Sequence, residues 1–219
     1  MTRILIFTRT TDYRHESIEH GTEVLTSIAA AEGWGAEQTE DPRAFTARRL
    51  AAFDAVVWLS PSGDVLDDDG RRDFAAWLTA GGAYAGVHCA TFCEQGWPEY
   101  ERISGGYFTG HPEIQPATVL VADAAHPSTA HLPPSWRHVD EWYEFRAPAP
   151  LGKTVLLTVD EDTYSGGSMG PGHPIAWHGP YGSGATWYSA LGHAPEAYDD
   201  PLIREHLRGG LLSVVERRT

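Results

Sequence analysis

The chain has 219 residues with 16 basic and 30 acidic side chains, which gives a formal net charge of −14. This charge would repel a phosphate backbone, so the composition argues against nucleic acid as a partner and favours a small-molecule role. The apolar stretches stay well short of the roughly 20 residues of a membrane helix, and no signal-peptide core follows Met1. We therefore expect one cytoplasmic domain over residues 1–219, without a membrane partner.

The first half of the chain alternates apolar strands with amphipathic helices. This alternation predicts a mostly parallel sheet with helices on both faces, which is a doubly wound α/β domain. In such a domain the ligand crevice lies at the carboxyl ends of the strands, so loops 9–15 and 60–64 and the turn at His88 should meet there. The predicted elements are, in order, strand 3–8, helix 16–31, strand 36–39, helix 45–50, strand 53–59, a helix that begins at 67–69 and ends before Gly81, and strand 84–87.

The strand 84–87 stops abruptly at His88, and the small residues that follow favour the start of a helix. His88 would then occupy a sharp strand-to-helix turn that lifts its side chain above the sheet, as in a nucleophile elbow. Cys89 follows at once, and Cys93 comes four residues after it on the expected helix. That spacing is near the upper limit for a disulfide, and a reducing compartment also opposes the bond. We expect two free thiols.

In the second half of the chain no long helix separates the apolar runs. We expect strands at 117–121, 139–145, 154–159, 174–178 and 185–190, which either extend the sheet or add antiparallel strands to it. The glycine-rich stretch 165–173 fits either a mobile flap or a rigid loop. An amphipathic helix over 201–215 is the last predicted element.

Three histidines, His15, His88 and His193, fall at strand ends or in the loops that follow them. Along the expected strand 139–145, Glu141 and Tyr143 share one face. Each histidine alone also fits a partly buried structural role, and a charged face on an edge strand is ordinarily solvated. Their joint placement favours a site. The sequence lacks the HExxH, paired CxxC, P-loop and GxGxxG motifs, so no nucleotide cofactor is expected.

Seven motifs follow one another along nearly the whole chain: Arg14-His15-Glu16-Ser17-Ile18, Thr39-Glu40-Asp41-Pro42, Gly63-Asp64-Val65-Leu66, Gly86-Val87-His88, Asp140-Glu141-Trp142-Tyr143, His173-Pro174-Ile175-Ala176-Trp177 and Ala190-Leu191-Gly192-His193. Together they resemble the ThuA-like (trehalose utilisation) family. That family belongs to the class I glutamine amidotransferase-like group of flavodoxin-type folds. The resemblance therefore implies a flavodoxin-like, three-layer domain, which agrees with the doubly wound pattern.

The sequence departs from true amidotransferases at the elbow. Those enzymes place a cysteine there in a Gly-x-Cys pattern, whereas Gly86-Val87-His88 places a histidine there and moves Cys89 one residue on, where it would point elsewhere. The downstream His193-Ala194-Pro195-Glu196 resembles their His-Pro-Glu with one extra residue. Hydrolysis of an amide by a thiolate is therefore disfavoured. Two imidazoles that face one crevice suit metal ligation or acid–base chemistry.

The resemblance implies a role in disaccharide catabolism, with trehalose or a related glycoside handled as its 3-keto derivative. We hypothesise a sugar-converting enzyme, a hydrolase or lyase, that uses acid–base chemistry assisted by a divalent metal such as zinc. The predicted catalytic residues are His15, His88, Glu141, Tyr143 and His193, and the predicted metal ligands are His88, His173 and His193. The predicted substrate contacts are Asp64, His111, Trp142, His173 and Trp177, with Trp142 or Trp177 stacking on a sugar ring.

Two other interpretations remain open at this point. One is a non-catalytic carbohydrate-binding or regulatory module on an amidotransferase-like scaffold that has lost its nucleophile. The other is an amidase or hydrolase that uses Cys89 as its nucleophile. Metal content, turnover of a sugar and thiol alkylation distinguish the three interpretations. The sequence is also compatible with a homo-oligomer.

Overall fold

The computed structural model describes residues 1–216. Its strands are β1 Arg3–Phe7, β2 Gly35–Thr39, β3 Ala55–Leu59, β4 Ala83–Val87, β5 Phe108–Gly110, β6 Gln115–Val121, β7 Ser135–Asp140, β8 Glu144–Phe145, β9 Thr154–Asp160, β10 His173–Tyr181 and β11 Gly184–Ser189. Its α-helices are α1 Ser17–Ala31, α2 Ala47–Leu50, α3 Asp68–Thr79, α4 Pro98–Ser104 and α5 Pro201–Val215. Short 3-10 turns are η1 Pro42–Ala44, η2 His88–Thr91, η3 Glu161–Thr163 and η4 Pro195–Asp199.

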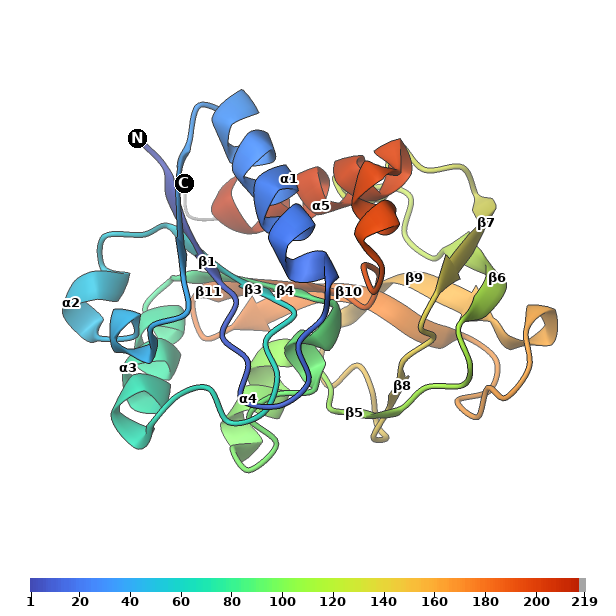
Figure 1. Cartoon of the computed structure of the whole chain (residues 1–219), viewed down its shortest axis with the longest axis horizontal. Helices are drawn as coiled ribbons and strands as arrows, with labels where there is room; N and C mark the ends of the chain where they lie inside the picture. Colours follow the sequence, from blue (N-terminus) through green and yellow to red (C-terminus); the bar gives the residue numbers. More distant parts are fainter. Residues whose placement is uncertain (217–219) are drawn as a thin grey trace.

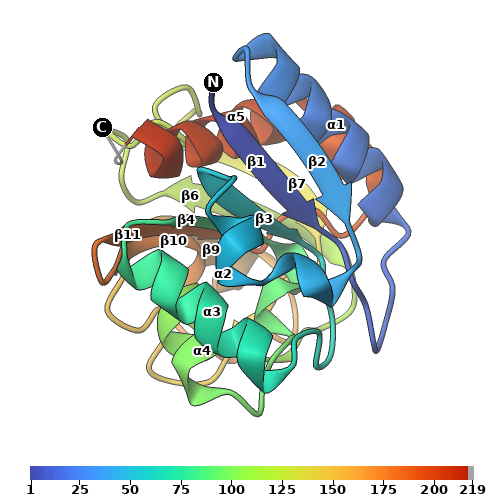
Figure 2. The same cartoon turned by 90° about the vertical axis from the view of Figure 1, so that its left-hand side faces the viewer.

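A nine-stranded sheet in the order β2-β1-β3-β4-β11-β10-β9-β6-β7 runs through the molecule. Its first five strands are mutually parallel, with α1 and α5 on one face and α2, α3 and α4 on the other (Figures 1 and 2). Because both faces are covered, every residue of β3 and β4 is buried, as expected for central parallel strands. The prediction of an α/β domain with helices on both faces of a largely parallel sheet is confirmed.

The last four strands of the sheet, β10, β9, β6 and β7, pair antiparallel, which confirms the predicted antiparallel strands in the second half. The predicted single strand 139–145 is wrong. The chain leaves the main sheet at Asp140, whose carboxylate accepts the N–H groups of Glu141 and Gly192. The residues that follow form β8, which pairs with β5 in a separate two-stranded sheet. The pairing of β7 with β6 therefore ends at Asp140, where the side chain forms these hydrogen bonds, although the alternating pattern of the sequence continues to residue 145.

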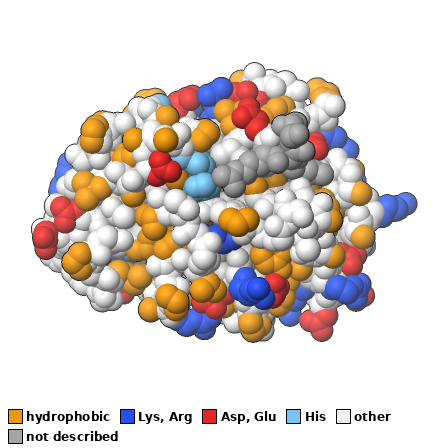
Figure 3. Space-filling model, turned by 180° about the vertical axis from the view of Figure 1, so that it is seen from behind, with side chains coloured by type: hydrophobic (Ala, Val, Ile, Leu, Met, Phe, Trp, Pro, Cys, Tyr) orange, Lys and Arg blue, Asp and Glu red, His pale blue; other side chains and the backbone are white. Residues whose placement is uncertain are grey.

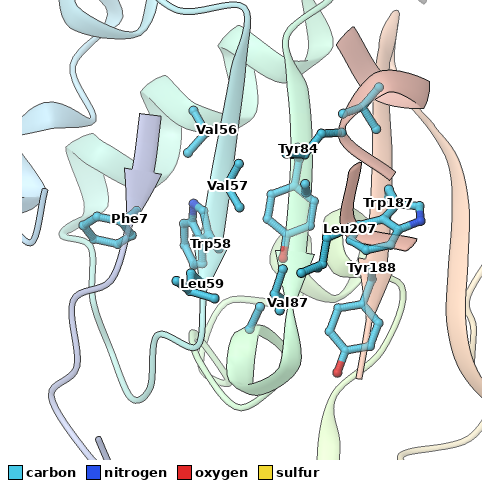
Figure 4. Packing of buried hydrophobic residues seen from close by; sticks show 14 of the residues in the cluster. Phe7, Val56, Val57, Trp58, Leu59, Tyr84, Val87, Trp187, Tyr188 and Leu207 are labelled. Carbon is cyan, nitrogen blue, oxygen red and sulfur yellow. The ribbon is translucent and has the colours of Figure 1, made fainter. Parts of the chain in front are cut away.

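The core is built around aromatic rings that lie between the parallel strands and their helices (Figure 4). Trp58 on β3 stacks on Phe74 and on Tyr100, with ring centroids 5.4 Å and 4.8 Å apart. Tyr84 on β4 lies next to this group, and its hydroxyl is 2.9 Å from that of Tyr100. Offset and edge contacts of this kind add to the free energy of burying the rings. The strand ends that carry the site are therefore held by a rigid aromatic layer.

Acidic and basic side chains lie interspersed with apolar ones over the face of the molecule seen in Figure 3, rather than gathered into one basic surface. Within residues 1–216, no helix combines the length and the apolar character needed to cross a membrane.

His206 on α5 is buried against the sheet, with its ring centroid 5.0 Å from that of Trp187. Its Nδ1 lies 2.7 Å from the Ser128 carbonyl, which can only accept, so Nδ1 carries the proton. Its Nε2 then accepts the hydroxyl of Ser189 at 3.1 Å. Burial lowers the pKa of His206 to about 4, so the folded protein holds the neutral ring.

We expect the free energy of unfolding to fall by about 3 kcal/mol as the pH drops from 6.5 to about 4, through His206 alone. In this window the unfolded chain takes up a proton at His206 and the folded chain does not. Urea unfolding at several pH values measures the slope, which His206→Gln should flatten.

His20→Gln is the matched control for this slope. Hydrogen bonds to Asp199 and Glu23 raise the pKa of His20, so its contribution to stability is complete below pH 6.5 and is lost as the pH rises above that value. The slope between pH 4 and 6.5 should therefore survive in His20→Gln. An equally steep slope in His206→Gln would show that this ring is not the group responsible.

Candidate functional site

The site lies where the parallel strands end, and it begins with the turn after β4. His88 has a left-handed φ of 49°, and the Tyr188 hydroxyl donates to its carbonyl at 2.8 Å. Gly86 is required just before the turn, because a Cβ there would overlap the Tyr84 hydroxyl. The predicted sharp turn at His88 is present, but it continues as the 3-10 turn η2 instead of a helix. The strained backbone holds the His88 ring over the strand ends.

The His88 ring is fully buried and fixed in one orientation. Its Nδ1 lies 2.7 Å from the carbonyl oxygen of Ala190, so Nδ1 carries the proton and the Nε2 of the neutral ring offers a lone pair. That Nε2 accepts the Tyr143 hydroxyl at 2.9 Å and lies 3.1 Å from His15 Nε2. A backbone carbonyl behind the ring is the usual way in which a protein orients a histidine that binds a metal.

Four side chains from distant parts of the chain converge beside this lone pair. One ligand atom from each of His15, His88, Glu141 and His193 lies within 4.8 Å of the others. Glu141 Oε2 is 3.3 Å from His88 Nε2, 3.1 Å from His193 Nδ1 and 3.9 Å from His15 Nε2. His15 follows β1, Glu141 follows β7 and His193 follows β11. We call these four residues the His₃Glu cluster.

The electrostatics of the cluster favour an ionised carboxylate among imidazoles. Burial alone would raise the pKa of Glu141, but the neighbouring imidazoles of His15, His193 and His88 hold it well below its usual range. Burial lowers the pKa of His15, and the neighbouring His88 adds to this effect while Glu141 opposes it. The Glu141 carboxylate raises the pKa of His193. The cluster therefore holds a fixed negative charge facing nitrogen atoms that burial keeps poorly hydrated.

The cluster fits a divalent metal by donor type and by spacing. Ligand atoms about 2.1 Å from a tetrahedral zinc ion are separated from one another by about 3.4 Å. Four of the pairs in the cluster are 3.1 to 3.9 Å apart, and all pairs lie within 4.8 Å. His193 Nδ1 is buried 3.1 Å from Glu141 Oε2 without the angle of a hydrogen bond, so this nitrogen has no hydrogen-bond partner among residues 1–216. Imidazole nitrogens with one carboxylate oxygen are the ligands of many zinc sites.

A pocket of about 330 Å³ opens next to the cluster. His111, in the loop after β5, is one-third exposed. Its Nε2 lies 3.3 Å from Glu141 Oε1, which is the carboxylate oxygen that the other three histidines do not approach. Three aromatic rings that the sequence did not single out, those of Tyr13, Phe92 and Phe108, also border the pocket. Tyr13 lies in loop 9–15, which the sequence predicts at the ends of the strands. Its place in that loop was a signal in the sequence that Tyr13 could border the pocket. The lining residues are Tyr13, His15, Cys89, Phe92, Phe108, His111, Glu141 and Tyr143.

A model of the ThuA family, described as trehalose utilisation, matches residues 3–213. The chain belongs to the ThuA family. This membership supports a carbohydrate-related role. No curated protein matches the chain.

Solved structures share the architecture of this ThuA-family chain. A ThuA-like protein from Bacteroides uniformis is 22% identical to this chain, with a TM-score of 0.80. The match covers 97% of this chain and 91% of that protein. One from Parabacteroides merdae is also 22% identical, with a TM-score of 0.77 and coverage of 97% and 90%. A cytoplasmic protein from Salmonella typhimurium is 10% identical with a TM-score of 0.66, and covers 98% and 99%. At these identities the likeness concerns the fold.

The structure corrects the predicted metal set at His173. Both nitrogens of His173 are used elsewhere, Nδ1 beside Glu161 Oε1 at 2.8 Å and Nε2 beside the Tyr143 carbonyl at 2.8 Å. His173 therefore supports Tyr143 from behind and lies outside the cluster. Glu161 also accepts the N–H groups of Met169 and Gly170, which ties down the glycine-rich stretch.

Four predicted substrate contacts lie outside the pocket lining: His173, described above, Trp142, Trp177 and Asp64. The indole N–H of Trp142 donates to the Gln115 carbonyl and that of Trp177 to the Ser104 carbonyl, and both rings are fully packed in the core. A ring buried on all sides has no face left for a sugar, so neither tryptophan stacks on a substrate. The Asp64 carboxylate is exposed and pairs with Arg71 at 3.3 Å, away from the lining.

Cys89 does not point elsewhere as expected, because it forms part of the pocket wall. Its side chain is nevertheless buried, and burial raises the pKa of the thiol to about 12. A nucleophilic cysteine needs a lowered pKa, so this environment disfavours the Cys89 amidase. Cys89 and Cys93 are both free thiols, as predicted.

Proposed function

We propose that this ThuA-family protein is a metal-dependent hydrolase or lyase that acts on a keto-glycoside derived from a disaccharide of the trehalose type. The observation that carries the proposal is the His₃Glu cluster beside an aromatic pocket. The family description, trehalose utilisation, supports a sugar as the substrate. The rings of Tyr13, Phe92 and Phe108 offer flat apolar faces for it, the role that the sequence suggested for the tryptophans.

In this proposal His15, His88, Glu141 and His193 hold a divalent metal, zinc or one of similar preference. When bound, the ion would supply a positive charge that stabilises negative charge developing on a carbonyl oxygen of the substrate. The Ala190 carbonyl keeps His88 in one orientation, and the Nε2 lone pair that accepts the Tyr143 hydroxyl in this structure would bind the metal instead. His15, His88 and His193 thus act by position and charge, and the proton chemistry falls to His111 and to the Glu141 oxygen that faces the pocket.

His111 Nε2 and Glu141 Oε1 are the proton-transfer groups that face the pocket, 3.3 Å apart. A keto group makes the adjacent C–H acidic, and in this proposal one member of the pair removes that proton. The glycosidic C–O bond on the following carbon then breaks, its electron pair leaves with the oxygen, and the oxygen takes up a proton. The products are a free sugar and an unsaturated keto sugar, to which water adds in the hydrolase variant of the reaction.

The test compares 3-keto-trehalose with trehalose itself, using protein as purified, protein stripped with a chelator, and stripped protein reloaded with Zn²⁺. We expect about one equivalent of metal, turnover of the keto sugar alone, and activity that is lost on stripping and restored by metal. Full turnover by the stripped protein would reject the metal. Sugar binding without metal and without turnover would support the non-catalytic carbohydrate-binding module instead.

We further propose that the fold is flavodoxin-like, in the class I glutamine amidotransferase-like group. Counted among themselves, the parallel strands β2-β1-β3-β4-β11 have the order 2-1-3-4-5, which is the flavodoxin order and supports this assignment. We also propose a cytoplasmic location, which the likeness to the cytoplasmic protein from Salmonella typhimurium supports.

A further inference from the structure

Asp140, the last residue of β7, has a buried carboxylate. This carboxylate contacts two chain segments, one that carries Glu141 and one that carries His193. Its Oδ1 accepts the N–H of Glu141 at 2.9 Å and that of His193 at 3.2 Å, and its Oδ2 accepts the N–H of Gly192 at 2.9 Å. We infer that Asp140 is a positioning residue for the metal site, and that it fixes Glu141 and His193 relative to each other. This inference rests on the proposed function.

The two segments meet at a point where neither belongs to the main sheet. Glu141 comes directly after the end of β7, and His193 lies between β11 and η4. Gly192 has a φ of 117°, a conformation that suits glycine, and it turns its own N–H toward Asp140. The Asp140 carboxylate therefore supplies acceptors that strand pairing does not supply here, across a separation of 52 residues in sequence.

Asp140 controls the ligand atoms of Glu141 and His193 through their backbones, because only a few covalent bonds separate each bound N–H from the ligand atom of the same residue. Glu141 Oε2 and His193 Nδ1 are 3.1 Å apart, and each belongs to a residue whose N–H is bound to the same oxygen, Asp140 Oδ1. Loss of that acceptor frees both backbones and lets the two ligand atoms move apart. Groups that orient metal ligands in this way typically account for a factor of about 10–100 in metal affinity.

Glu94 provides a matched control. Its carboxylate is also fully buried and also accepts two backbone N–H groups, those of Val65 at 2.8 Å and Leu66 at 2.7 Å, with Arg71 as a further partner. None of these contacts involves a residue of the His₃Glu cluster. Glu94→Gln therefore disturbs a comparable structural carboxylate without touching a metal ligand.

The experiment starts from metal-free protein. One portion is titrated with Zn²⁺ in competition with a chromophoric chelator, which gives the dissociation constant for Zn²⁺. Another portion is loaded with Co²⁺, and its visible spectrum is recorded. Stability is measured on the same samples by urea unfolding without metal. The variants are Asp140→Ala, Asp140→Asn and Glu94→Gln. Asparagine retains one oxygen, which can still accept the N–H groups of Glu141 and His193, so it should rescue part of the loss.

We expect Asp140→Ala to bind Zn²⁺ about 10–100-fold more weakly with a changed Co²⁺ spectrum, Asp140→Asn to fall between it and the original protein, and Glu94→Gln to keep the original affinity. The inference is overturned if Asp140→Ala binds Zn²⁺ within twofold of the original protein. It is also overturned if Glu94→Gln loses affinity equally, because the effect would then be structural. If the original protein binds neither ion, the proposed function fails first and this inference falls with it.

Discussion

Substitution of His88 by alanine is expected to lower the conversion of a keto-glycoside by about 10³-fold or more and to weaken metal binding. The ring is fully buried, and its Nε2 faces His15 and Glu141. Without this ring, only His15, Glu141 and His193 remain of the His₃Glu cluster. The measurements are the initial rate with 3-keto-trehalose and the Zn²⁺ dissociation constant.

Two further variants separate the imidazole from its surroundings. His88→Asn keeps a residue type that tolerates the left-handed φ of 49°, so it should fold with the turn intact and still be inactive. Cys89→Ala removes a buried thiol of the pocket wall whose pKa is about 12, and it should keep activity within about tenfold. Unchanged conversion in His88→Ala would reject the assignment of the turn. Inactivity of Cys89→Ala with metal still bound would revive the thiol mechanism.

Trp58→Ala is expected to lower the free energy of unfolding by about 3–5 kcal/mol, the largest loss of stability that we predict for one substitution. Trp58 on β3 is fully buried and stacked on Phe74 and Tyr100, and its removal leaves a cavity that these rings can only partly fill. Urea unfolding of the metal-free protein measures the loss. A cost below about 1 kcal/mol would show that the aromatic layer repacks freely.

Phenylalanine at the same position gives a sharper test. The indole N–H of Trp58 has no hydrogen-bond partner among residues 1–216, whereas that of Trp177 donates to Ser104 at 2.7 Å. Trp58→Phe removes a buried donor that has no partner, so it should lower the free energy of unfolding by about 1 kcal/mol or less. Trp177→Phe leaves the Ser104 carbonyl without its hydrogen bond, so it should lower the free energy of unfolding by about 1–3 kcal/mol more than Trp58→Phe does. Equal costs for the two substitutions would mean that Trp58 finds a partner in solution.

Much of the parallel half of the fold was predictable from local pattern. The apolar runs that became β1, β3 and β4 are each buried on both faces, and the glycines at 33 and 81 follow the helices α1 and α3. Such patterns are read within a window of some ten residues, because burial of one face repeats with the period of the element. The turn at His88 was predictable for the same reason, since an apolar strand ends there.

The break after β7 was not predictable in this way. The run 139–145 alternates as one strand would, yet Glu141, Trp142 and Tyr143 leave the sheet because Asp140 binds backbone N–H groups from both Glu141 and Gly192. One of these donors is 52 residues away in sequence. A competing acceptor at that distance leaves no trace in a local pattern.

The α/β architecture, the family motifs and the candidate histidines and acids of the site can all be predicted from the sequence. The three-dimensional packing shows how these residues are grouped: it adds His15 and Glu141, predicted as catalytic residues, to the ligand atoms of His88 and His193, and it turns His173 toward Glu161 and Tyr143. The physical reason is that ligand geometry depends on distances of a few ångströms between segments far apart in the chain. Those distances are set by packing and by buried acceptors such as Asp140, not by the identity of the ligand residues.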